Sequence, residues 1–250
     1  RAGEVTPEMK TVAEQEGVDP IWLRDEVAAG RVVIPVNRSG GRGAPCGIGE
    51  GLLVKVNANI GTSSDRADLD EELEKLKASI AAGTDTVMDL STGNNISASL
   101  QAVLRESTVP VGTVPIYQAV VEAVESQGGL IKLGVDKIFE VIEQQAAQGV
   151  DFITVHCGLT RAALEMLKYE GRITDIVSRG GAFLTTWMLH HDEENPLYAH
   201  YDRLLEIARR YDVTLSLGDG LRPGCLADAT DRAQIHELMT LGHLTQLAWE

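Results

Sequence analysis

The chain has little positive charge, and this shortage limits what it can bind. Its 22 lysines and arginines stand against 37 aspartates and glutamates, which gives a formal net charge of −15. A surface of this charge repels nucleic acid and anionic membranes, so any bound phosphate must be held by a local group of residues. We therefore expect neither nucleic acid nor a membrane among the partners.

Cysteines and long apolar runs are also scarce. Cys46, Cys157 and Cys225 lie far apart and match neither a disulfide framework nor a C-x-x-C metal pattern. No apolar run approaches the roughly 18 residues of a membrane span, and the first residues lack the regions of a secretory signal peptide. These absences predict a soluble protein of a reducing cytoplasm.

The chain has only 8 prolines and is 44% hydrophobic, which argues against disorder and allows one large core. We interpret residues 1–51 as a small N-terminal cap, with helices over 8–16 and 20–29, a brief β-like run over 32–36 and a glycine-rich stretch over 37–51. Within that stretch, Ser39-Gly40-Gly41-Arg42-Gly43 lacks the G-x-x-x-x-G-K-[ST] pattern of a phosphate loop. A flexible loop is predicted there.

From residue 52 onward, apolar β-rich runs alternate with helical patterns. Strands are predicted over residues 52–60, 86–90, 109–116, 152–155, 173–177 and 214–217. Helices are predicted over residues 69–82, 96–105, 136–148, 161–170, 182–190, 201–211 and about 231–250. Apolar strands joined by crossover helices indicate a parallel sheet covered on its outer face. The predicted fold class is α/β, a (β/α)8 barrel of the TIM type in which residues 52–250 supply about six of the eight units, truncated before strands 7 and 8.

Polar or small residues follow the predicted strands, and in such a barrel the carboxyl ends of the strands converge on one site. Alternation places Asn57 and Asn59 on the same side of the first strand. Asn59 suits a ring nitrogen or a ribose hydroxyl, but an asparagine at a strand end equally satisfies a turn. Met88 could pack on a flat substrate or simply fill space. The neighbouring Asp89 requires either a hydrogen-bond partner or a role in the site.

The third and fourth predicted strands end in residues with two interpretations each. Tyr117 follows Pro115 and could offer a hydroxyl and a ring to a ligand, or could be structural. His156 could be an acid–base group, a hydrogen-bond donor to substrate or a metal ligand, although an isolated histidine is more often structural.

The fifth strand end carries the most specific chemical pattern. In Val177-Ser178-Arg179-Gly180-Gly181, two glycines let backbone N–H groups close on an anion, while Ser178 adds a hydroxyl and Arg179 adds charge. A helix N-terminus directly after them adds its dipole. The pattern predicts a phosphate cradle, and the alternative is a glycine turn beside a solvated arginine.

At the sixth strand end, Gly218-Asp219-Gly220-Leu221-Arg222 combines an acid and a base between glycines. Asp219 could bind ribose hydroxyls or an exocyclic amine, and Arg222 could reach a phosphate. The alternative is an ordinary salt bridge on a loop.

Together these strand-end motifs resemble those of the phosphomethylpyrimidine synthase family of thiamine biosynthesis, and the resemblance spans essentially the whole chain from Val5-Thr6-Pro7-Glu8-Met9 onward. The motifs that carry it are Asn59-Ile60-Gly61, Met88-Asp89-Leu90-Ser91-Thr92-Gly93, Gly112-Thr113-Val114-Pro115-Ile116-Tyr117-Gln118, Ser178-Arg179-Gly180-Gly181 and Gly218-Asp219-Gly220-Leu221-Arg222-Pro223-Gly224.

The resemblance implies a radical S-adenosylmethionine (SAM) lyase that converts 5-aminoimidazole ribotide to 4-amino-5-hydroxymethyl-2-methylpyrimidine phosphate. It also implies a [4Fe-4S] cluster, SAM, a divalent metal (zinc or iron), an electron donor and a homodimer. No residue of this chain receives a catalytic or metal-ligand role. The residues implied to contact the ribotide are Asn59, Met88, Tyr117, His156, Ser178, Arg179, Gly180, Asp219, Gly220, Leu221 and Arg222.

Three parts of the family pattern do not occur in the chain. These are the seventh-strand Glu-Gly-Pro-Gly-His motif, a second metal-binding histidine and the C-terminal cysteine motif that ligates the cluster. The three cysteines present are too widely spaced to replace that motif. We therefore expect the metal and cluster ligands to lie outside this chain, and residues 1–250 alone to be inactive and to aggregate because strand edges stay unpaired.

Other functions stay open at this point. The related 5-hydroxybenzimidazole synthase uses the same ribotide in anaerobic cobamide biosynthesis, and the motifs do not separate the two enzymes. A non-catalytic ribotide-binding barrel is a second alternative. A phosphate-binding aldolase is a third, but it would need a Schiff-base lysine at a strand end, whereas Lys55 falls within a predicted strand.

Overall fold

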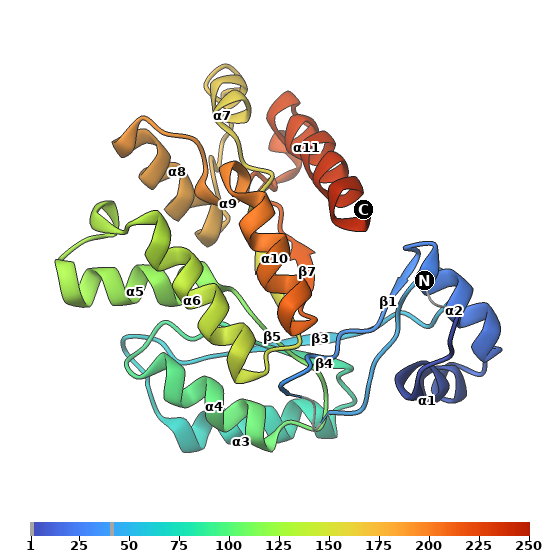
Figure 1. Ribbon diagram of the computed structural model, residues 1–250. Helices are drawn as coiled ribbons and strands as arrows, with labels where there is room; N and C mark the ends of the chain where they lie inside the picture. The colour runs from blue at the N-terminus through green and yellow to red at the C-terminus, as the bar shows by residue number, and fades with distance from the viewer. Residues whose placement is uncertain (1–2, 41–42) are drawn as a thin grey trace. The chain divides into compact units, whose positions relative to one another are not determined.

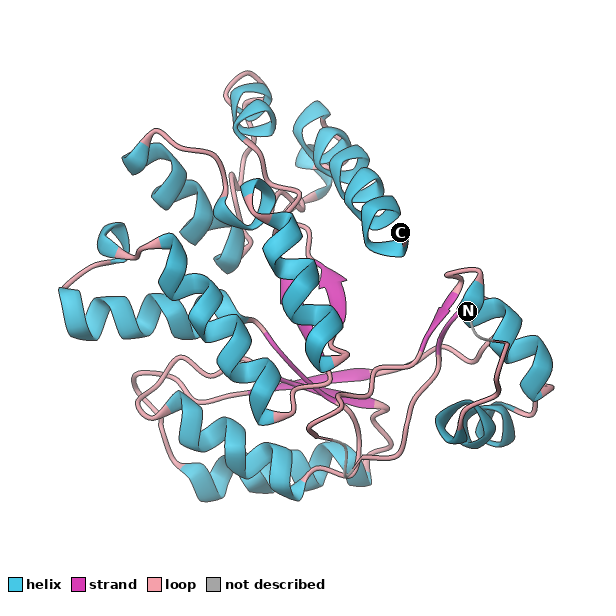
Figure 2. Ribbon diagram, viewed as in Figure 1, coloured by secondary structure: helices cyan, strands magenta, loops and turns pink. Residues whose placement is uncertain are grey.

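The structure is a computed structural model that describes residues 3–40 and 43–250 (Figure 1). Gly41 and Arg42 of the predicted glycine-rich loop lie outside the described residues. The described chain contains both helices and strands (Figure 2). In chain order the elements are α1 (Pro7–Glu16), α2 (Pro20–Ala28), β1 (Val32–Val33), β2 (Ile48–Gly49), β3 (Asn57–Ile60), α3 (Leu69–Ala81), β4 (Thr86–Asp89), α4 (Ile96–Glu106), β5 (Val111–Thr113), α5 (Pro115–Gln127), η1 (Leu130–Lys132), α6 (Val135–Gln148), β6 (Phe152–Val155), α7 (Arg161–Leu167), α8 (Arg179–His191), α9 (Pro196–Ala199), α10 (Tyr201–Tyr211), β7 (Thr214–Leu217), η2 (Leu226–Asp228) and α11 (Arg232–Trp249).

The main sheet has five strands in the order β3-β4-β5-β6-β7, which is also their order along the chain. Strand β3 pairs in parallel with β4, β4 with β5, and β5 with β6. Parallel neighbours require crossover connections, and helices α3, α4 and α6 supply them within this run. The predicted α/β class with a parallel sheet is confirmed, while closure into a (β/α)8 barrel stays a prediction.

The chain forms two compact units. The first comprises residues 1–113, 145–153 and 210–214, and the second comprises residues 114–144, 154–209 and 215–250. The division into an N-terminal cap over residues 1–51 and a partial barrel over residues 52–250 stays a prediction.

In the first unit, α1, α2 and β1 enclose a small core of their own. Thr6 and Asp19 cap the two helices, and a proline follows each cap at the first helical position, where its missing N–H costs nothing. Val12, Leu23 and Val32 are buried against one another at the centre. The two predicted N-terminal helices are confirmed.

The buried carboxylate of Asp151 connects the start of β5 to the segment around Asn37 in the first unit. Asp151 accepts the backbone N–H of Asn37 at 3.0 Å and that of Val111 at 2.9 Å. Burial raises the pKa of Asp151, although both hydrogen bonds oppose the increase. The carboxylate thus serves the backbone as a structural acceptor.

Helices α5, α7, α8 and α11 pack in pairs in the second unit. Helix α11 packs along α7, and α5 packs on α8. Leu184 and Met188 of α8 are buried, and the indole N–H of Trp187 donates to the carbonyl of Leu133 at 2.7 Å. Helices over 201–211 and 231–250 are confirmed by α10 and α11. No helix among residues 3–40 and 43–250 is long and apolar enough to span a membrane.

The predicted strand over residues 173–177 is wrong. This segment is irregular, Ile173 is 75% exposed, and Asp175 has a positive φ of 52°. The carboxylate of Asp228 accepts the backbone N–H groups of Ile173 and Thr174 at 2.8 and 2.9 Å. Because a side chain takes the donors that a sheet ladder would use, the apolar run forms a tethered loop. Five parallel strands, rather than six, are present in the described chain.

The strand predicted over residues 109–116 is shorter in the structure. β5 ends at Thr113, and Pro115 begins α5, a helix that the sequence interpretation missed. The sequence pattern suits a strand-end proline, but the fixed φ and missing N–H of Pro115 equally suit the first turn of a helix. Tyr117 therefore lies in the first turn of α5 and not at a strand end.

Candidate functional site

His156 directly follows β6 and is the most enclosed of the predicted site residues with an ionisable side chain. It is 4% exposed, and its ring lies between two glycines. A Cβ on Gly180 would lie 2.4 Å from Cε1 of the ring, and one on Gly218 would lie 3.3 Å from Nε2. Asn195 fixes the backbone here, because its amide donates to the carbonyls of His156 and Leu159 at 2.8 Å.

Burial lowers the pKa of His156 to about 4, with a smaller contribution from Arg222 and a partial opposing effect of Asp219. The imidazole is therefore neutral at pH 7. Its Nδ1 is buried and has no hydrogen-bond partner among the described residues. A neutral ring of this kind can donate or accept one hydrogen bond to a ligand, which favours a binding role over that of a permanent cation.

Helix α8 begins at the predicted phosphate cradle. Ser178 is the buried N-cap, and its hydroxyl accepts the N–H of Gly181 at 3.2 Å. The N–H groups of Arg179 and Gly180 occupy the first two helical positions, which have no carbonyl partner within a helix. The predicted helix N-terminus after these residues is confirmed, and it begins at Arg179 rather than Ala182. Anion binding by this terminus stays a prediction.

Tyr117 and Arg179 lie against each other in the second unit. The guanidinium carbon of Arg179 is 5.2 Å from the centre of the Tyr117 ring, and the ring of Phe183 meets Tyr117 edge-on at 6.1 Å. Burial raises the pKa of Tyr117, so its hydroxyl stays protonated and can donate a hydrogen bond. The cation–π contact orients Arg179 at the start of α8.

The loop from Asp219 to Arg222 follows β7 and approaches α8 closely. A Cβ on Gly181 would lie 2.3 Å from the carbonyl oxygen of Gly220, so only glycine permits this approach. The carboxylate of Asp219 is 3.6 Å from the guanidinium of Arg222, and the two side chains are 61% and 42% exposed. The salt-bridge alternative is thus realised in part, yet both groups are accessible to a ligand.

Asn59 and Met88 lie in the first unit. They face each other as Cα partners in the parallel register of β3 and β4. The amide of Asn57 donates to the amide oxygen of Asn59 at 2.9 Å, which confirms that these two side chains share one side of the strand. Of the eleven residues implied to contact the ribotide, Asn59 and Met88 therefore lie in the first unit and the other nine lie in the second.

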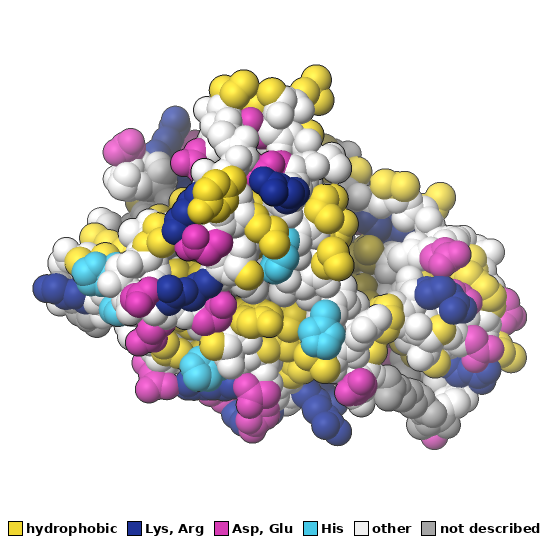
Figure 3. Space-filling model, turned by 90° about the horizontal axis from the view of Figure 1, so that it is seen from above, with side chains coloured by type: hydrophobic (Ala, Val, Ile, Leu, Met, Phe, Trp, Pro, Cys, Tyr) yellow, Lys and Arg dark blue, Asp and Glu magenta, His cyan; other side chains and the backbone are white. Residues whose placement is uncertain are grey.

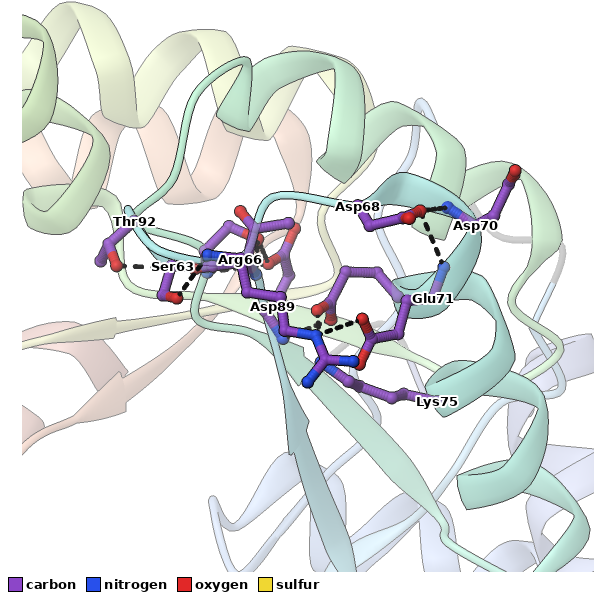
Figure 4. Close-up of polar contacts among 12 residues, drawn as sticks. Ser63, Arg66, Asp68, Asp70, Glu71, Lys75, Asp89 and Thr92 are labelled. Atoms are coloured by element: carbon purple, nitrogen blue, oxygen red, sulfur yellow. Dashed lines mark hydrogen bonds and ion pairs between the residues drawn. The ribbon is translucent and has the colours of Figure 1, made fainter.

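Asp89 finds its partner in Ser91. One carboxylate oxygen accepts the Ser91 N–H at 2.9 Å and its hydroxyl at 2.5 Å, and burial raises the pKa of the carboxyl group. Figure 4 shows Asp89 beside the polar contacts that start α3, where Asp68 accepts the N–H groups of Asp70 and Glu71. Asp89 is thus bound through one oxygen, whereas its Oδ2 is buried and has no hydrogen-bond partner among the described residues.

The sequence interpretation missed Glu237, which lies in α11. Its carboxylate accepts the N–H of Gly220 at 2.7 Å and that of Leu221 at 2.8 Å. Burial raises the pKa of Glu237 to about 7 although these two hydrogen bonds oppose the shift. Nothing in the sequence around this glutamate distinguishes it from one on a solvated helix, because its partners lie 16 and 17 residues away.

The cysteines do not form a metal or cluster site. Cys46 and Cys157 are buried, and burial raises the pKa of their thiols to about 11 and 12, so both are protonated at neutral pH. No group of three or more His, Cys, Asp or Glu residues is arranged to hold a metal in the part of the chain that the structure describes. These residues therefore do not fit a [4Fe-4S] cluster.

Because the chain carries a formal net charge of −15, an anion must be bound by a local group of residues. On the face shown in Figure 3, acidic and basic side chains are interspersed, with no broad basic patch among the described residues of that view. The α8 N-terminus, Arg179 and Arg222 are accordingly the groups in the second unit best suited to a phosphate.

Comparisons with known proteins agree with the strand-end motifs. The sequence model described as the radical SAM ThiC family matches residues 1–250. Relatives named phosphomethylpyrimidine synthase include those of Moorella thermoacetica, Desulforamulus reducens and Dehalococcoides mccartyi, at 64%, 58% and 56% identity. Each alignment covers 100% of this chain and 58% of the relative. The chain thus spans less than two thirds of the length of these proteins.

Proposed function

This chain belongs to the radical SAM ThiC family, and from that membership we propose that it is part of a phosphomethylpyrimidine synthase. The family resemblance drawn from the motifs is thereby confirmed. The proposed reaction converts 5-aminoimidazole ribotide to 4-amino-5-hydroxymethyl-2-methylpyrimidine phosphate in thiamine biosynthesis. Relatives of that name, 54% to 64% identical over nearly the whole chain, support this assignment.

Within this proposal, the second unit binds the ribotide. The observation that carries it is the assembly of His156, the α8 N-terminus and the Asp219–Arg222 loop around two glycine contacts, Gly180 to His156 and Gly181 to Gly220. The N–H groups of the first turn of α8 suit the phosphate, and they would act with the charge of Arg179.

Other groups suit the uncharged parts of the ligand. The exposed carboxylate of Asp219 can accept from ribose hydroxyls or an exocyclic amine, and the neutral His156 can hydrogen-bond to the imidazole. Asn59 and Met88 are proposed as further contacts from β3 and β4. We assign no catalytic role to an individual residue.

Family membership also implies SAM and a [4Fe-4S] cluster, which when bound supply a deoxyadenosyl radical. The cysteines of this chain do not fit the cluster, so we place its ligands, and those of a divalent zinc or iron ion, in the rest of the protein. An electron donor, a homodimer, a cytoplasmic location and a closed (β/α)8 barrel complete the proposal.

The test is turnover by the full-length protein under anaerobic conditions with ribotide, SAM and a reductant, followed by product identification by mass. We expect the hydroxymethylpyrimidine phosphate. 5-Hydroxybenzimidazole would instead establish the rival enzyme, ribotide binding without turnover would favour a non-catalytic binding barrel, and absence of ribotide binding would refute all three.

A further inference from the structure

Helix α11 places a buried carboxylate directly behind the Asp219–Arg222 loop. Glu237 is 1% exposed, and it lies on the buried face of α11 with Ala233 and Leu244. Its two oxygens each take one backbone N–H, from Gly220 and from Leu221. A Cβ on Gly220 would lie 3.0 Å from Oε1, so the carboxylate and the loop backbone are in close contact.

These two hydrogen bonds determine how the loop presents its side chains. With the N–H groups of Gly220 and Leu221 directed at α11, the flanking Asp219 and Arg222 project outward and stay accessible. Arg172 holds the same stretch from its other side, since its guanidinium donates to the carbonyl of Leu221 at 2.7 Å. Both backbone groups of Leu221 are thus hydrogen-bonded, the N–H to Glu237 and the carbonyl to Arg172.

The same contact reaches the proposed phosphate cradle. Gly220, whose N–H is held by Glu237, lies against Gly181 in the first turn of α8. One carboxylate therefore fixes the loop that carries Asp219 and Arg222 next to the helix terminus that carries Ser178 and Arg179.

Burial of Glu237 is unfavourable in itself. Among the described residues the carboxylate forms no ion pair within 4 Å, and desolvation outweighs the two hydrogen bonds in its titration. Arg172, whose charge favours the ionised form of Glu237, is itself bound to Asp231 at 2.6 and 2.9 Å. The hydrogen bonds from Gly220 and Leu221 are therefore the contacts that partly compensate the burial of this carboxylate.

We propose that Glu237 is a positioning residue for ribotide binding, which it serves by holding Gly220 and Leu221 so that Asp219 and Arg222 face the ligand. This inference rests on the proposed function of the second unit. Glu237 does not itself touch the ligand; it acts through the loop.

The matched control is Asp151 in the first unit. It is also a buried carboxylate with two backbone N–H partners, Asn37 and Val111, and none of these residues is a proposed ligand contact. In Glu237→Gln and Asp151→Asn, one oxygen can still accept an N–H, but the new NH2 group faces the second donor. Both substitutions should therefore lower the unfolding temperature.

Only Glu237→Gln should weaken ligand binding. In the full-length protein we expect its ribotide Kd, measured by calorimetry without SAM, and its KM each to rise at least tenfold, with kcat changed less than threefold. Asp151→Asn should leave Kd and KM within twofold of the wild type. Equal Kd values in the wild type and both variants would reduce Glu237 to a structural role and overturn the inference.

A wild-type protein that binds no ribotide would instead refute the proposed function, and the inference with it. A further measurement requires no variant. Hydrogen exchange in the wild-type protein should show the amides of Gly220 and Leu221 protected above that of Asp219, whereas rapid exchange at both would overturn the inference even if Glu237→Gln did not fold.

Discussion

Substitution of Gly180 by alanine should disrupt the site at the contact between Gly180 and His156. The new Cβ would lie 2.4 Å from Cε1 of His156 and 2.5 Å from Nδ1, well inside van der Waals contact. A shift of the ring that would relieve this contact is restricted, because the side chain is buried and Gly218 lies near its other edge. Overpacking of this kind costs about 1–3 kcal/mol, and the helix-propensity gain of alanine returns only about 0.5–1 kcal/mol. Near the middle of both ranges, the expected net loss is about 1–2 kcal/mol.

The assay is thermal unfolding and ribotide calorimetry on the full-length protein. A loss of this size lowers the unfolding temperature by roughly 2–8 °C in a domain of 150–250 residues, and displacement of the α8 start should raise the ribotide Kd about tenfold. Gly242→Ala is the matched control, because Gly242 lies within α11 and, apart from its chain neighbours and the nearby backbone of α11, no described atom lies within 4 Å of its added Cβ. That variant should be slightly stabilised, with an unchanged Kd. Equal stability and affinity of Gly180→Ala and wild type would refute the packing argument.

Three further predictions concern charge and titration. Arg179→Gln should raise the ribotide Kd at least tenfold, because it removes a charge from the proposed phosphate site. The control Arg38→Gln removes an exposed ion pair in the first unit and should change the Kd less than twofold. Similar Kd values for both variants would contradict the assignment of Arg179 to the phosphate. The buried thiols of Cys46 and Cys157 should resist iodoacetamide at pH 8 in the folded protein, as mass spectrometry of peptides can show, and rapid labelling of either would be inconsistent with their raised pKa values. Glu237 retains its proton in the folded state up to about pH 7 but loses it near pH 4.5 when unfolded, so its contribution to stability falls as pH rises through that window. Relative to Glu237→Gln, denaturant titrations should show the wild type losing up to about 3 kcal/mol between pH 4.5 and 7, and a constant difference would disprove the shift.

The sequence predicts the elements that local patterns determine. Apolar runs bounded by turn residues correctly indicate β4, β6 and β7, and the 3.6-residue period indicates α3, α10 and α11. The strand predicted over residues 52–60 is too long, because only Asn57–Ile60 forms β3. The local pattern Ser178 to Gly181 also predicts a helix N-terminus, since serine followed by glycines suits an N-cap.

Long-range contacts account for what the sequence could not predict. Residues 173–177 have the apolar character of a strand, but Asp228, more than 50 residues away, takes the N–H groups of Ile173 and Thr174. Glu237 is missed for the same reason, because its buried position follows from tertiary packing and not from a motif. Pro115 is ambiguous locally, since a strand end and a helix start both tolerate its missing N–H.

The most direct test of the site is a crystal structure of the full-length protein with 5-aminoimidazole ribotide bound. We expect the ribotide phosphate within hydrogen-bond distance of the Arg179 and Gly180 N–H groups, and the remainder of the ligand in contact with His156 and Asp219. A ribotide whose phosphate lies away from the start of α8, or which leaves His156 and Asp219 without contact, would contradict this account.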